Sequence, residues 1–112
     1  MCRAVKVLCV AADDEALRAL RLATMAAEWE LTPGATNETD AFGLIDSERP
    51  HTMVVFGDFE HLVSLVRDRF PAIRIVTDRD APGASAVAPS RDDVREVLRS
   101  LARPGGPILE GS

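Results

Sequence analysis

The chain has 112 residues, 46% of them apolar, which is enough to bury one hydrophobic core and suits a single domain. Its net charge of −5 and its dispersed arginines disfavour a nucleic-acid surface, which needs clustered Lys and Arg. The apolar runs are short and interrupted by charge, so we expect no signal peptide, no membrane span and a cytoplasmic location. The chain has one lysine against twelve arginines, a bias that is typical of a GC-rich bacterial genome.

The first predicted strand is Val5–Val10 (VKVLCV), a near-continuous apolar run typical of a strand buried on both faces. Within it, Cys9 is expected to be a small buried residue, too far from the other cysteine of the chain to form a disulfide. A helix is predicted over residues 15–28, with Asp13 and Asp14 at its N-terminus. Its inner face is expected to carry Leu17, Leu20, Thr24 and Ala27, with Leu22 and Met25 at the edges.

Residues 29–31 predict a short strand at a sheet edge, because Pro33 shortly after it cannot donate to a central ladder. A helix capped by Asn37 or Thr39 follows and ends at Glu48. The remaining elements are predicted in this order: a buried strand over 52–56, a helix over 59–70, strands over 73–77 and 84–88, and a last helix capped by Ser90.

Strands that alternate with helices predict an α/β domain with a doubly wound, parallel, five-stranded sheet covered on both faces. The domain is expected to span residues 1–103, followed by a flexible tail over 104–112. Only Asp78–Gly83 separates the last two strands, whereas a parallel crossover needs roughly a dozen residues or more. We therefore predict that the fourth helix is missing or reduced to a loop. One sheet edge would then be thinly covered and would suit a partner.

Several stretches of the sequence combine into a known order of motifs. An acidic cluster follows the apolar first strand, and the stretch NETDAFGLIDSERPHTMVV joins a helix, an Arg-Pro turn and a strand. The stretches FPAIRIVT and GASAVAPS then contain the fourth and fifth strands. Together these motifs resemble the receiver domain of bacterial two-component response regulators, which has the flavodoxin-like fold of CheY. The resemblance covers about residues 5–102.

The resemblance implies a phosphoryl-transfer site at the carboxyl ends of the strands. In the family, two acidic residues after the first strand hold Mg²⁺, and an aspartate ending the third strand accepts the phosphoryl group. A hydroxyl ending the fourth strand and a lysine after the fifth contact the phosphoryl oxygens. In this chain those positions fall on Ala11 and Ala12 for the acidic pair, Phe56 for the phosphoacceptor, Thr77 for the hydroxyl and Ala88, before Pro89, for the lysine.

Of these positions, only Thr77 keeps the family's residue type. The departure predicts an atypical receiver, or pseudo-receiver, which keeps the fold without the switch chemistry and in which Phe56 fills the emptied pocket. Neither a cofactor nor an enzymatic activity is expected. The resemblance also suggests a cis peptide bond before Pro89.

A second interpretation uses Asp58, which lies two residues beyond Phe56 and therefore on the same face of an extended strand. Asp13 and Asp14, with Asp78, would join it in a displaced Mg²⁺ site, and Asp58 would be the phosphoacceptor. Helix N-capping explains Asp13, Asp14 and Asp58 equally well without any chemistry. A third interpretation is a regulatory domain that senses a small ligand at the strand ends, although the sequence predicts no specific pocket.

The sequence thus favours a phosphorylation-independent signalling domain of a bacterial regulator, which acts through a protein partner or a homodimer. Homodimerisation is expected at the thinly covered fifth strand, and transcription control would follow if a longer chain continued into a helix-turn-helix. His51 and His61 have no evident partner and are expected to be ordinary surface residues. Four arginines recur every four residues and form either a solvated helix face or a docking stripe for an acidic partner: Arg91, Arg95, Arg99 and Arg103.

Overall fold

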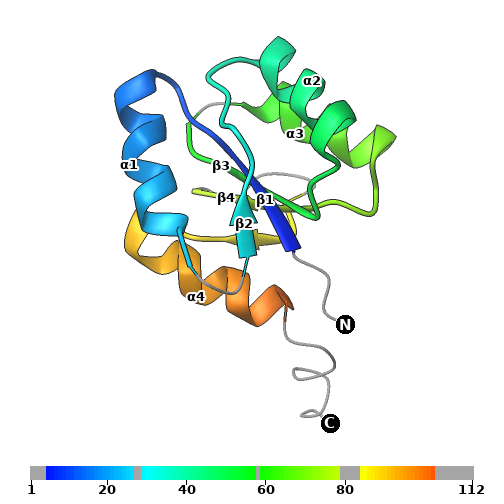
Figure 1. The fold of residues 1–112 in the computed structure, drawn as a ribbon. Coiled ribbons are helices and arrows are strands. Elements are labelled where there is room, and N and C mark those ends of the chain that lie inside the picture. Colours follow the sequence, from blue (N-terminus) through cyan, green and yellow to red (C-terminus); the bar gives the residue numbers. More distant parts are fainter. Residues whose placement is uncertain (1–4, 27–28, 58, 79–83, 103–112) are drawn as a thin grey trace, which may run out of the picture.

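The computed structural model describes residues 5–26, 29–57, 59–78 and 84–102. Among these residues, no helix is long and apolar enough to cross a membrane. The predicted tail, residues 104–112, lies outside the described part. Strands and helices alternate along the chain (Figure 1): β1 (Val5–Val10), α1 (Asp14–Thr24), β2 (Trp29–Leu31), α2 (Glu38–Glu48), β3 (Thr52–Val55), α3 (Glu60–Arg69), β4 (Arg74–Thr77), β5 (Ala86–Val87) and α4 (Arg91–Ala102).

The five strands form one parallel sheet in the order β2-β1-β3-β4-β5. The chain runs from β1 out to β2 at one edge, then returns past β1 to β3 and continues to β5 at the other edge. This reversal makes the sheet doubly wound and places the topological switch point between β1 and β3. The predicted fold class and the edge position of β2 are confirmed.

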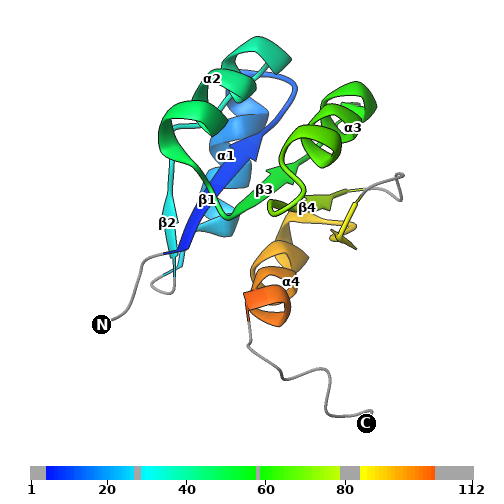
Figure 2. The ribbon, with the colours of Figure 1, turned by 90° about the vertical axis from the view of Figure 1, so that its right-hand side faces the viewer.

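Helices cover both faces of the sheet, with α1 and α4 on one face and α2 and α3 on the other (Figure 2). Alternate residues of β3 belong to the two cores. Met53 and Val55 pack toward α2 and α3, whereas Val54 packs toward α1 and α4. All three side chains are buried. A strand buried on both faces has no polar side, which is why β1 and β3 are nearly continuous apolar runs in the sequence.

Helix α1 ends at Thr24, earlier than the predicted helix over 15–28. The indole Nε1 of Trp29 donates a hydrogen bond of 2.7 Å to the carbonyl oxygen of Thr24. Because this donor satisfies a carbonyl that the end of a helix leaves unpaired, the helix can stop there. Met25 follows as the C-cap, with φ −58° and ψ 131°. Ala27, which was predicted to face inward, lies outside the described residues.

The buried face of α1 is narrower than its apolar pattern predicts. Leu20 and Thr24 are buried as expected, and Leu17 is half-buried. Leu22 and Met25, predicted at the edges of the inner face, are instead 60% and 54% exposed. The helix therefore presents two large apolar side chains to solvent.

The other elements agree with the predicted ranges to within a few residues, which is the usual uncertainty of element ends. Strand β5 is the most shortened, with two residues in place of the predicted 84–88. Just before β5, the pairing with β4 is made partly by a side chain, since the hydroxyl of Ser85 accepts a hydrogen bond of 3.1 Å from the Ile75 N–H. The Ser85 N–H donates to the Ile75 carbonyl oxygen at 2.7 Å. This mixed pairing explains why the regular ladder starts only at Ala86.

The link between β4 and β5 contains no helix among its described residues, Asp78, Ala84 and Ser85, while residues 79–83 lie outside the description. The described residues contain four helices and none in this link, which agrees with the prediction that the fourth helix of the series is missing or reduced to a loop. Strand β5 is left as the edge of the sheet, with its Val87 side chain 37% exposed.

Candidate functional site at the carboxyl ends of the strands

Parallel pairing brings the ends of four strands into one row. Val10 of β1 pairs with Val55 of β3, which pairs with Thr77 of β4, which pairs with Val87 of β5. The next residue of each strand continues the row, with hydrogen bonds from Phe56 N to Val10 O (2.9 Å) and from Ala88 N to Thr77 O (2.8 Å). The row just beyond the strands therefore consists of Ala11, Phe56, Asp78 and Ala88.

Phe56 occupies the middle of this row and is half-buried. Its side chain packs against the cluster on the α1 and α4 face, which contains Ala11 and Ala88. Both alanines are completely buried. The positions that the resemblance assigns to a carboxylate, a metal ligand and a lysine are thus occupied by a phenyl ring and two methyl groups. Such surroundings disfavour any charged group, because burying a charge without a partner is costly.

Asp13 is the N-cap of α1. Its backbone is extended, and its Oδ1 accepts a hydrogen bond of 2.8 Å from the N–H of Ala16. Asp14 is the first residue of the helix, where a negative charge is favoured by the helix dipole. Both side chains are exposed. Capping therefore accounts for the positions of these two carboxylates.

Asp58, the alternative phosphoacceptor, lies outside the described residues. The interpretation that places it on the face of Phe56 needs extended backbone through Gly57. Gly57 has a φ of +119°, outside the range of an extended strand. A Cβ at this position would lie 3.3 Å from Cε2 of Phe59, so the residue is constrained both by its backbone angle and by its neighbour.

Thr77 is buried at the end of β4, and Asp78 beyond it is half-buried. Each makes a polar interaction within the structure. In the part of the chain that the structure describes, no three His, Cys, Asp or Glu side chains form a group that could hold a metal ion. Thr77 at the end of β4 thus contributes one hydroxyl, and Asp78 in the row beyond it contributes one carboxylate, beside the apolar centre at Phe56.

Cys9 is the last residue but one of β1 and is buried, as predicted. Burial raises the pKa of its thiol from 9.0 to about 11, although a hydrogen bond with Thr24 and the charge of Arg21 oppose the rise. Cysteine reacts as the thiolate. Cys9 is therefore protonated and unreactive at neutral pH, which is consistent with a packing role.

The two histidines are exposed, as predicted, but each has a partner. Nδ1 of His61 lies 3.0 Å from Oε1 of Glu38 and links the N-terminal turns of α3 and α2. Nδ1 of His51 accepts the N–H of Lys6 at 3.1 Å. The expectation that the two histidines have no partner was wrong, because their partners are distant in sequence.

The cis peptide bond suggested before Pro89 is also wrong, since the described residues contain no cis peptide bond.

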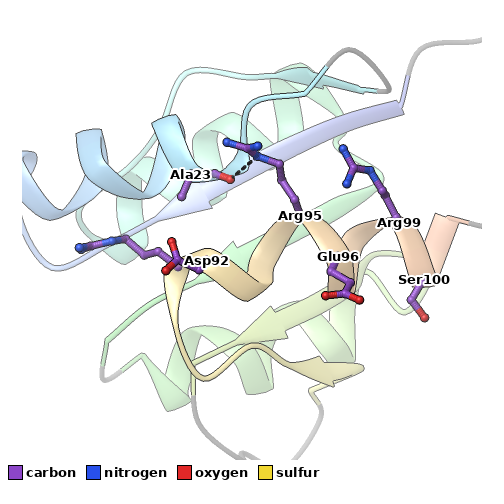
Figure 3. A pocket seen from close by; sticks show the side chains of 7 residues that line it. Ala23, Asp92, Arg95, Glu96, Arg99 and Ser100 are labelled. Carbon is purple, nitrogen blue, oxygen red and sulfur yellow. Dashed lines mark hydrogen bonds between the residues drawn. The ribbon is translucent and has the colours of Figure 1, made fainter.

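A hollow in the described surface lies away from the strand ends, between α4 and the C-terminal end of α1 (Figure 3). It measures about 670 Å³ and is lined by Ala23, Arg91, Asp92, Arg95, Glu96, Arg99 and Ser100. Nε of Arg95 donates to the carbonyl oxygen of Ala23 at 2.8 Å, and Nη2 is 3.5 Å from that of Leu22. The predicted arginine face of α4 is present, and Arg103 lies outside the described residues. The four-residue spacing did not predict that Arg95 donates a hydrogen bond to a carbonyl oxygen in the last turn of α1.

Comparisons with known proteins were made by sequence and by structure. No protein-family model matches the chain, and no curated protein matches it. Solved structures of receiver domains do match it. The apo receiver domain of RcsB from Salmonella enterica serovar Typhimurium superimposes with a TM-score of 0.73 and 14% identity, covering 95% of this chain and 98% of the other.

Two further receiver domains give the same result. The signal receiver domain of an HD domain-containing protein from Pseudomonas fluorescens Pf-5 has a TM-score of 0.71, 16% identity and coverages of 88% and 94%. That of the response regulator NarL from Mycobacterium tuberculosis has a TM-score of 0.71, 15% identity and coverages of 90% and 98%. At such low identity the likeness establishes the fold. The chain therefore has the receiver-domain fold of response regulators.

Proposed function

We propose that this chain is a phosphorylation-independent receiver-like domain that acts through protein–protein contacts and is not itself an enzyme. The observation that carries the proposal is the packing of Phe56 against the buried cluster that contains Ala11 and Ala88. Phe56 occupies the position that the resemblance to receiver domains assigns to the phosphoacceptor aspartate, and the cluster against which it packs is apolar.

The chemistry of phosphoryl transfer supports this reading. The reaction needs a nucleophilic carboxylate, a metal ion that neutralises the developing charge, and cationic or hydroxyl groups on the transferred oxygens. A phenyl ring accepts no phosphoryl group, and an alanine methyl group can replace neither a metal ligand nor a lysine. Of the matched positions, Thr77 alone retains a suitable group, and a single hydroxyl supplies none of the charge that the reaction requires.

Without this chemistry, the fold can still present surfaces to a partner protein or to a second copy of the chain. Direct contact with nucleic acid by this domain is disfavoured by its net charge of −5. Among the matching structures, that of the RcsB–DNA complex is longer than this chain, which covers 60% of it. We propose that any DNA contact by a protein containing this domain is made by another part.

The proposal is tested by incubating the domain with acetyl phosphate and Mg²⁺ and measuring the intact mass. We expect no phosphoryl adduct, both in the natural chain and in Asp58→Asn. An adduct that disappears in Asp58→Asn would contradict the proposal and support the alternative, a phosphoacceptor at Asp58 with a displaced Mg²⁺ site. An adduct that persists in Asp58→Asn would also contradict it and would place the phosphoryl group on another side chain.

A further inference from the structure

We draw no further inference here: the strongest candidate, the hollow of about 500 Å³ beside the start of β4 that Arg67, Ile73 and Ser85 help to line, carries nothing because nothing in the described part of the structure shows what covers it.

Discussion

Phe56 shows how one residue changes the chemistry of a whole row. Its backbone continues β3 through the hydrogen bond to Val10, so the side chain is held at the strand end. There it packs against the buried cluster of the α1 and α4 face. The ring thus stabilises the fold from the position that a phosphoacceptor would occupy. Its removal should therefore lower the free energy of unfolding through lost packing.

We predict that Phe56→Ala lowers the free energy of unfolding by about 2 kcal/mol, somewhat less than for a fully buried phenylalanine. Phe56→Leu should cost less than about 1.5 kcal/mol, because it conserves most of the apolar contact. Phe56→Asp should be the least stable of the three, since it puts a carboxylate beside Ala11 and Ala88. Urea unfolding with and without Mg²⁺ measures all of them. Rescue of Phe56→Asp by Mg²⁺ above the stability of Phe56→Ala would show that a polar site exists there after all.

Helix α1 illustrates how an element is ended by distant residues. Asp13 caps its N-terminus locally, as an aspartate before an apolar helical pattern predicts. Its C-terminus depends on Trp29, five residues on from Thr24, and on Arg95, which is 72 residues from Ala23 along the chain. A cation at the carboxyl end of a helix is also favoured by the helix dipole. The position of α4 and the length of α1 are therefore coupled.

We expect Arg95→Ala to lower the free energy of unfolding by about 1 kcal/mol, the usual contribution of a hydrogen bond or of a charge at a helix end. Amide hydrogen exchange should rise in the last turn of α1. Arg91→Ala is the matched control on the same face of α4, and it should change stability by no more than about 0.5 kcal/mol. An equal loss of stability in both variants, measured by urea unfolding, would mean that the hydrogen bond to Ala23 does not account for the effect of Arg95.

At the scale of the whole molecule, two cores on opposite faces of one sheet hold the domain together. Cys9 belongs to the core between the sheet and the α1–α4 layer, and the titration of its thiol is coupled to folding. Burial raises the pKa of the thiol from 9.0 to about 11. The unfolded chain therefore loses this proton at lower pH than the folded domain does.

It follows that the contribution of Cys9 to stability is complete below pH 9 and is lost as the pH rises toward 11. The loss is at most about 3 kcal/mol for a pKa difference of this size. Urea unfolding of the natural chain and of Cys9→Ala at pH 8 and at about pH 10.5 separates this effect from all other titrations. We expect the natural chain to lose more stability over that interval than Cys9→Ala. Parallel losses would show that the thiol does not titrate with unfolding.

Much of the candidate site was accessible from the sequence because it depends on local patterns. The apolar runs of β1 and β3 place Ala11 and Phe56 at strand ends, and the short segment after Thr77 predicts the absence of a helix. The capping role of Asp13 follows from its place before a helical pattern. Whether Asp58 approaches this row could not be predicted, because strand alternation stops being a guide where Gly57 adopts a positive φ.

By itself the sequence determined the class of fold, the order of its elements and the apolar character of the row around Phe56, since these follow from periodicity, chain length and side-chain chemistry. Only the tertiary structure decided where α1 ends, which of its apolar side chains remain outside, and which partners Arg95, His51 and His61 take. The physical reason is the range of the contacts. A helix face or a strand is specified by neighbours a few residues away, whereas the cap that Arg95 provides and the exposure of Leu22 and Met25 depend on how separate elements pack.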